Sequence, residues 1–170
     1  MQINFLTDDR GDRIAQIDGA KLIFRNFEGR GDKYNREGDR NFAFVIPNEE
    51  LANKLMNDIN DDGAGWNVKI KPPRDEDDSP FMYLSVKVKF NKYGPRVYLH
   101  SGGRKPVLLD SESAKMLDVI DIRSADLDIR AFDNITNGKP YRTAYLQSIH
   151  VTQDIDRFAA RYAEEEYPCE

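Results

Sequence analysis

Cysteine and histidine are almost absent from this chain of 170 residues. The only cysteine is Cys169, and the two histidines are His100 and His150. One cysteine cannot form an internal disulfide, and with two histidines it cannot supply the ligands of the common His/Cys zinc sites. The scarcity predicts a protein of a reducing, cytoplasmic compartment with neither a zinc centre nor another bound cofactor.

Long hydrophobic runs and phosphate-binding glycine motifs are also missing. No apolar stretch approaches the roughly 20 residues of a membrane-spanning helix, and the mean hydropathy is -0.70. The opening residues, MQINFLTDDRGD, lack the apolar core of a secretory signal. Neither a Walker A motif nor a dinucleotide glycine fingerprint occurs. We therefore expect a soluble protein that is neither secreted nor built around a bound nucleotide.

Two segments in the middle of the chain alternate strictly between apolar and polar residues. Residues 66–71 read WNVKIK, and residues 81–90 read FMYLSVKVKF. A period of two is typical of a half-buried strand, so one row of each segment should be buried, beginning with Trp66 in the core. The other row should be exposed, and it carries cations and rings: Asn67, Lys69 and Lys71, then Phe81, Tyr83, Ser85, Lys87 and Lys89.

The formal net charge of -5 is unevenly distributed along the chain. From residue 154 onward six acidic residues face two arginines, so the preceding 153 residues are close to neutral. Residues 66–105 hold nine Lys or Arg against four acids, and all four acids fall at residues 75–78. Such asymmetry concerns partners rather than fold, and a surface that combines cations with rings suits single-stranded nucleic acid.

The candidate binding residues are cations and tyrosines on the exposed faces and in one long loop. A further strand at residues 96–99 places Arg96 and Tyr98 outward. The loop at residues 28–40 carries basic side chains and Tyr34, diluted by four acids, and suits a finger that closes over a strand. Cations would neutralise phosphates, and tyrosines would stack on bases. The full set is Arg25, Arg30, Lys33, Tyr34, Arg36, Arg40, Lys69, Lys71, Tyr83, Lys87, Lys89, Arg96 and Tyr98.

Three other interpretations stay open at this point. Exposed lysines can simply keep a sheet surface soluble and discourage aggregation. The same surface could bind a host protein, as an inhibitor or adaptor would. Asp126, Asp128 and Asp133 could be magnesium ligands of a nuclease, although outward acids on a half-exposed strand are usually just solvated. Since no catalytic motif stands out, the sequence favours a non-enzymatic protein.

The remaining patterns predict a mainly β protein. Strands are expected at residues 20–27, 41–47, 125–132 and 141–151, the last two joined by a tight turn at Asn137-Gly138. The first twelve residues show no pattern and are expected to be loose. Six or seven mostly antiparallel strands are accommodated most economically by a small closed or partly closed β-barrel.

Helical patterns are few. Asn48 is the expected N-cap of a helix of about three turns, with Leu51, Leu55 and Ile59 on its apolar face. Residues 110–117 suit a short helix. An apolar stripe at residues 155, 158, 159 and 162 predicts a C-terminal amphipathic helix.

The order of these segments resembles the OB-fold single-stranded-DNA-binding proteins encoded by tailed bacteriophages. The matching pieces are the opening strand AKLIFRNFEG, the NFAFVIP strand leading into a helix, the Trp66 strand, the central basic strand and the DLDIRAFDNITNGKPYRTAYL hairpin with its closing strand. The resemblance covers most of residues 15–153, and the charged loop at residues 28–40 departs from it.

The resemblance implies an OB-like antiparallel β-barrel with one inserted helix and a C-terminal helix. Residues 1–153 would form the single-stranded-nucleic-acid-binding domain, and residues 154–170 an acidic C-terminal helix and tail. Such a protein coats exposed single-stranded DNA in phage replication or recombination, without catalysis, in the cytoplasm of the bacterial host. RNA stays open as a ligand. The acidic C-terminus would recruit replication or recombination proteins.

Overall fold

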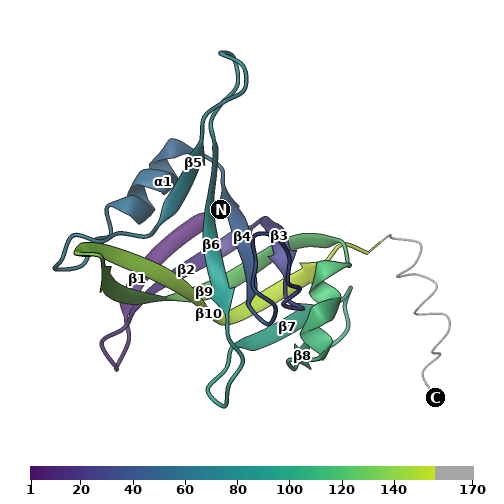
Figure 1. Cartoon of the computed structure of the whole chain (residues 1–170). Helices are drawn as coiled ribbons and strands as arrows, with labels where there is room; N and C mark the ends of the chain where they lie inside the picture. Colours follow the sequence, from purple (N-terminus) through teal and green to yellow (C-terminus); the bar gives the residue numbers. More distant parts are fainter. Residues whose placement is uncertain (156–170) are drawn as a thin grey trace, which may run out of the picture.

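The computed structural model describes residues 1–155, and its main feature is one mixed sheet of ten β-strands (Figure 1). The strands are β1 (Gln2–Thr7), β2 (Arg13–Ala20), β3 (Leu22–Asn26), β4 (Arg40–Ile46), β5 (Val68–Lys71), β6 (Phe81–Val88), β7 (Arg96–His100), β8 (Val107–Leu109), β9 (Ile122–Thr136) and β10 (Lys139–Gln153). The helix α1 (Glu49–Met56) follows β4, and the 3-10 helix η1 (Ser113–Asp118) follows β8. No helix within residues 1–155 is long and apolar enough to cross a membrane.

The sheet runs in the order β1-β2-β9-β10-β6-β4-β3. Three strands lie off this path: β5 pairs with β6, β7 pairs with β10, and β8 pairs with β7. β10 pairs with β6 and with β7 in parallel, whereas its pairing with β9 is antiparallel. The expectation of a mainly β fold is therefore confirmed. The expectation of a closed or partly closed barrel is wrong, because β1 and β3 end the sheet without pairing to each other. Most strand pairings are antiparallel as expected, and the two exceptions are those of β10 with β6 and with β7.

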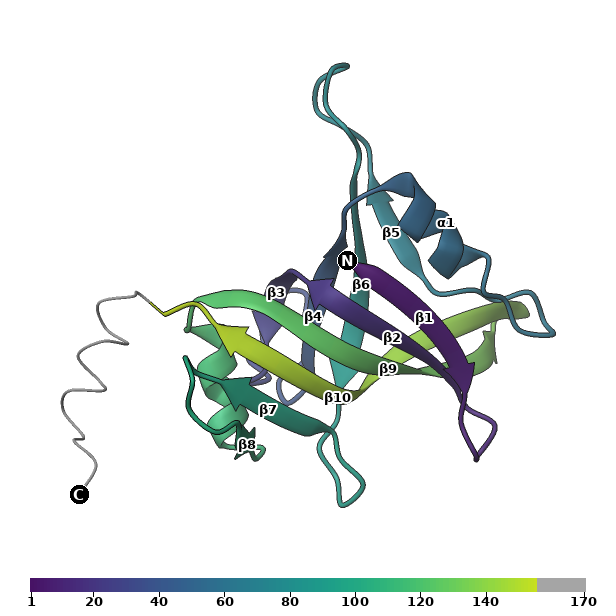
Figure 2. The same ribbon diagram turned by 180° about the vertical axis from the view of Figure 1, so that it is seen from behind.

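The β9–β10 hairpin contains the two longest strands, and its turn lies at Asn137-Gly138, as the sequence predicted. Asn137 and Gly138 have φ values of 52° and 76°, the left-handed pair that a tight two-residue hairpin turn requires. A register shift between Leu146 and Ser148 marks a bulge on β10. Beyond this bulge the free edge of β10 passes from β6 to β7 (Figure 2).

The core fills the concave side of the curled sheet. The alternation in β6 is confirmed, since Met82, Leu84, Val86 and Val88 are all buried. Trp66 is buried as expected, although it lies just before β5 rather than within it. Other large core side chains come from strands far apart in sequence: Ile3, Ile17, Phe27, Phe42, Phe44, Ile129 and Ile149. The rings of Phe27 and Phe42 stack with their centroids 5.1 Å apart.

Several expected elements differ from those observed. The first residues are not loose, because β1 pairs along its whole length with β2, a strand that the sequence pattern did not reveal. β8 was also missed, and residues 113–118 form a 3-10 helix. The predicted C-terminal helix begins at the edge of the described residues and lies mostly outside them.

The helix α1 starts as predicted and ends early. Asn48 caps it by accepting a hydrogen bond from the Leu51 N–H at 2.9 Å. The helix stops at Met56, and Ile59 is 59% exposed, so the expected third turn is wrong. The chain instead returns against the end of the helix, where a Cβ on Gly65 would lie 2.1 Å from the Met56 carbonyl oxygen. Only glycine permits that approach.

An ion-pair network around the buried Arg142 ties this returning segment to the sheet. Arg142 on β10 is 3% exposed and donates to both carboxylate oxygens of Asp133 on β9, at 2.6 and 3.1 Å. It also donates to the main-chain carbonyl of Asp58 at 2.7 Å, and its guanidinium lies 5.0 Å from the ring centroid of Trp66. The Asp58 carboxylate accepts from Arg13 at 2.6 Å and from the Trp66 indole at 2.9 Å.

We predict that Arg142→Met lowers the free energy of unfolding by about 3 kcal/mol, because Asp133 and Asp58 lose a buried counter-charge. Urea denaturation followed by tryptophan fluorescence measures this. The matched control is Arg123→Met, which removes an ion pair with Asp154 whose side chains are 65% and 58% exposed. This control should lower the stability by less than about 1 kcal/mol.

The same measurement repeated across pH tests the cause. Burial by itself would raise the pKa of Asp58 and of Asp133. Hydrogen bonds from Arg13 and Trp66 and the charges of Arg13 and Arg142 nevertheless lower the pKa of Asp58 below its ordinary range. The hydrogen bond and charge of Arg142, together with a hydrogen bond from Asn60, lower the pKa of Asp133 in the same way. Their contribution is therefore present above the unfolded-state pKa of about 3.9 and is lost as the pH falls through the folded-state values. Stability should decline below about pH 4, less steeply in Arg142→Met; parallel profiles would contradict the assignment.

Candidate nucleic-acid interface

The outward row of β6 faces away from the core and carries Phe81, Tyr83, Ser85 and Lys87. Strand pairing places further predicted residues beside this row. Lys69 of β5 is the register partner of Tyr83, and Lys71 is the partner of Phe81. The lysine faces of the two strands predicted from sequence therefore form one continuous surface.

Three rings, the exposed Phe24 and Phe81 and the half-buried Tyr83, form the centre of this surface; we call them the aromatic cluster. Phe24 of β3 meets Tyr83 edge to face, with centroids 5.3 Å apart, and meets Phe81 in the same way at 6.5 Å. Phe81 and Tyr83 lie 5.6 Å apart. Phe24 is 58% exposed and Phe81 38% exposed. Part of each ring is therefore open to solvent, and neither ring belongs to the hydrophobic core.

Phe24 reaches the cluster through an unusual backbone conformation. Its φ is 51°, the left-handed region that bulky residues rarely adopt and that costs about 1–3 kcal/mol. A register irregularity between Ile23 and Asn26 in the β3–β4 pairing accompanies it. Regular alternation would place Phe24 in the same row as the buried Leu22, so the sequence contained no signal that Phe24 belongs to the surface.

Two lysines surround the aromatic cluster. The Lys71 Nζ lies 5.7 Å from the Tyr83 centroid and 5.9 Å from that of Phe24, and the Lys69 Nζ lies 5.8 Å from the Tyr83 centroid. These distances fit cation–π contacts. Both lysines are exposed. The arrangement therefore combines partly exposed apolar rings with ammonium groups that lie over them.

Lys87 and Lys89 continue the cationic surface toward the opposite end of β6. Lys87 is the register partner of Tyr145 on β10, and Lys89 follows directly after the strand. Five of the thirteen predicted residues thus share one face: Lys69, Lys71, Tyr83, Lys87 and Lys89. Their binding role stays a prediction.

Three predicted arginines are instead engaged near η1. Arg25 donates to the main-chain carbonyls of Leu117 and Ile120, each at 2.7 Å. Arg40 donates to the Ser111 carbonyl at 2.5 Å and lies over the Phe90 ring at 4.9 Å. Arg30 lies 3.8 Å from Glu28 and 4.0 Å from Asp118. These contacts connect the segment at residues 25–40 to η1 and the residues on either side of it. They give the three arginines a structural role that requires no ligand.

The rest of the loop at residues 28–40 is internally organised rather than extended. The Asn35 amide donates to the carbonyls of Arg30, Arg36 and Asp39. Tyr34 is 89% exposed and has Lys33 over its ring at 5.5 Å. Lys33, Tyr34 and Arg36 are thus on the surface, and none of the ring or cation–π contacts of the aromatic cluster involves them.

Arg96 and Tyr98 lie on β7, in a different chemical setting. Tyr98 stacks on His150 with centroids 4.6 Å apart, and His150 Nδ1 lies 2.8 Å from His100 Nε2. The neighbouring positions of β9 are acidic, and burial together with Asp18 raises the pKa of Asp128. One face of the Tyr98 ring is therefore covered by the His150 imidazole.

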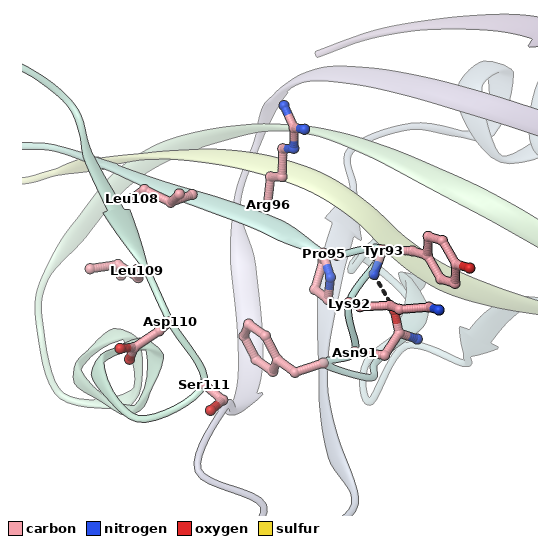
Figure 3. Close-up of a pocket in the computed structure, with 11 residues that line it drawn as sticks. Asn91, Lys92, Tyr93, Pro95, Arg96, Leu108, Leu109, Asp110 and Ser111 are labelled. Atoms are coloured by element: carbon pink, nitrogen blue, oxygen red, sulfur yellow. Dashed lines mark hydrogen bonds between the residues drawn. The ribbon is translucent and has the colours of Figure 1, made fainter.

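Arg96 also lines a pocket between the loop after β6 and the segment around β8 (Figure 3). The loop is shaped by a turn in which Asn91 Oδ1 accepts from the Tyr93 N–H at 2.8 Å. Leu108, Leu109 and Asp110 form the facing wall. Arg96 is exposed but lies away from the aromatic cluster.

The three carboxylates considered as magnesium ligands are not assembled into a site. Asp133 is held by the buried Arg142, and Asp126 accepts a hydrogen bond from the Gly19 N–H at 2.8 Å. Within residues 1–155 no group of three or more His, Cys, Asp or Glu side chains is arranged to hold a metal ion.

Three solved structures similar to this chain are of one phage protein. The single-stranded DNA-binding protein from bacteriophage Enc34 matches with a TM-score of 0.50 and 12% identity, covering 93% of each chain. A C-terminal truncation of it gives a TM-score of 0.47 at 10% identity, covering 91% of this chain and 97% of that one. Its complex with ssDNA gives 0.49 at 13% identity, covering 91% and 93%. At such identities the full-length match supports a shared fold alone.

No curated protein matches the chain. The family model described as "Putative phage ssDNA-binding domain" matches residues 9–168, nearly the whole chain. The resemblance noted from the order of segments is thereby confirmed at the level of the family. The chain belongs to this phage ssDNA-binding domain family.

Proposed function

We propose that this protein binds single-stranded DNA without sequence specificity, through the outer face of β5 and β6. The observation that carries the proposal is the aromatic cluster, in which Phe24 and Phe81 are exposed, Tyr83 is half-buried, and Lys69 and Lys71 lie over the Tyr83 ring. Family membership supports it independently.

The mechanism is stacking combined with charge neutralisation. A base that stacks on Phe24, Phe81 or Tyr83 gains about 1–3 kcal/mol. Lys69, Lys71, Lys87 and Lys89 neutralise phosphates and release counterions. Every base has a flat face, so this mode tolerates any sequence. It disfavours duplex DNA, in which base faces are already stacked on one another.

The biological role follows from this mode of binding. We infer a non-enzymatic protein that protects exposed strands during phage DNA replication or recombination, in the cytoplasm of the bacterial host. The curled, mostly antiparallel sheet supports an opened relative of the OB fold. Recruitment of replication proteins by the acidic C-terminus stays a prediction, because residues 156–170 lie outside the described part of the chain.

We predict that the protein shifts a single-stranded oligo-dT in a native gel, that duplex competes poorly, and that added magnesium leaves the oligonucleotide intact. The affinity should fall steeply with salt. The double variant Lys87→Ala/Lys89→Ala should reduce the slope of log K against log salt by about 1.4 units, if each lysine contacts one phosphate of a single strand.

The matched control is Lys105→Ala/Lys115→Ala, which removes the same charge from the β7–β8 loop and from η1 and should leave affinity almost unchanged. Equal binding of duplex, or a slope that the Lys87/Lys89 variant does not alter, would contradict the proposal. Absence of any shift together with a stable host protein in a pull-down would instead favour a protein-interaction module. Magnesium-dependent degradation would identify a nuclease.

We also predict that Phe24→Asn separates binding from stability. Asparagine tolerates the left-handed conformation at this position, so the denaturation midpoint should stay the same or rise. Loss of the ring should weaken oligo-dT binding by about tenfold. Fluorescence anisotropy and urea denaturation measure the two effects.

The matched control for this variant is Phe24→Tyr, which keeps both the ring and the strained backbone. It should bind oligo-dT within about twofold of the unmodified protein. If Phe24→Asn binds as tightly as the unmodified protein, bases do not stack on this ring.

A further inference from the structure

A groove separate from the aromatic cluster crosses the outer face of β9 and β10. Its walls are the loop between β1 and β2 and the loop between β6 and β7, which project from the same side of the sheet (Figures 1 and 2). Its floor consists of Arg130, Phe132 and Tyr145. None of these three residues stood out in the sequence as a binding residue.

The floor of the groove repeats the chemistry of the aromatic cluster. Phe132 and Tyr145 meet edge to face with centroids 6.1 Å apart, and the Arg130 guanidinium lies 5.5 Å from the Tyr145 centroid. Phe132 is 48% exposed. Two rings and a cation thus face solvent on strands whose opposite row is buried.

The two walls approach each other above this floor. The Arg10 guanidinium of one loop lies 5.9 Å from the ring centroid of Tyr93 in the other. Each loop has its own supporting turn. Asp8 Oδ1 accepts from the Arg10 and Asp12 N–H groups at 3.0 and 2.8 Å, and Asn91 supports Tyr93 as described above.

The groove is continuous with the outward row of β6. Lys87 is the register partner of Tyr145, and Lys89 lines the groove. Lys87 lies four positions after Tyr83, which corresponds to about 13 Å along a strand. That distance matches about four nucleotides at the 3.4 Å rise of stacked bases, and fewer in a stretched strand.

We propose that this groove is a second base-stacking subsite and that one DNA strand occupies both it and the aromatic cluster. The inference rests on the proposed function. Asp8, Asp9 and Asp12 line the far wall and repel phosphates, so the backbone runs along the Lys87 and Lys89 side and the bases turn toward Tyr145. In this arrangement the contact between Arg10 and Tyr93 lies over the bound strand.

The test is fluorescence anisotropy with a labelled oligo-dT of about twelve nucleotides, within the 4–16 that such sites cover. Tyr145→Ala should weaken binding about tenfold, and Tyr145→Phe, which keeps the ring, should bind within about twofold. The matched control is Tyr141→Ala, since Tyr141 is an exposed ring on β10 that lies outside the groove and accepts from the Asn67 amide at 2.7 Å. It should also bind within about twofold.

Photocrosslinking locates the contact directly. An oligo-dT carrying 5-iodo-deoxyuridine at one position at a time should crosslink to the aromatic cluster from some positions and to Tyr145 or Phe132 from others. This readout uses the unmodified protein, so it stays decisive even where Tyr145→Ala does not fold.

The outcomes separate the two proposals. Failure of the unmodified protein to bind the oligonucleotide would overturn the proposed function. Binding with crosslinks to the aromatic cluster alone, from every position of the oligonucleotide, would overturn the second subsite and leave the proposed function standing. Crosslinks at both places, with loss of affinity in Tyr145→Ala, support both.

Discussion

The division of one edge of β10 between two parallel strands organises the rest of the molecule. β6 pairs with this edge at Tyr145, and β7 pairs with it beyond the bulge that follows Leu146. This junction lets β6 leave the β9–β10 hairpin and carry β5, β4 and β3 with it, so the sheet curls around its core without closing. The same junction sets Lys87 beside Tyr145, and it joins the two ring-bearing regions on one outer surface.

Local charge rather than net charge explains how an acidic protein can bind an anion. The chain carries -5 overall, but six of its acids lie at residue 154 or beyond, four lie at residues 75–78 in the β5–β6 loop, and Asp126 and Asp128 lie on β9. The aromatic cluster is flanked by lysines. Its most exposed member, Phe24, is held in a strained conformation, and strain of this kind persists where the surrounding structure has a use for it. Stability alone gives no reason to keep a bulky ring there.

Much of the architecture was predictable where one strand buries a single face or where a cap or turn residue marks the end of an element. The alternation in β6 identified its buried and exposed rows, Asn48 marked the start of α1, and Asn137-Gly138 marked the hairpin turn. Each of these signals is local, because it depends on residues within one element. The predictions failed where partners distant in sequence decide the outcome. β1 and β2 pair although neither has a strong pattern, Ile59 leaves the helix because the chain folds back at Gly65, and Arg25 and Arg40 bind carbonyls of a segment about 70 or more residues away.

The amino-acid sequence by itself determined the class of fold, the family resemblance and the chemistry of the exposed lysine rows, because alternation and composition are properties of the chain. Tertiary structure decided which of those side chains meet. Strand order, two parallel pairings and one left-handed residue brought Phe24 to Tyr83 and Lys87 to Tyr145. The same long-range pairing sent Arg25, Arg30 and Arg40 to η1. Neighbours across a sheet are set by long-range pairing, and no local pattern encodes them.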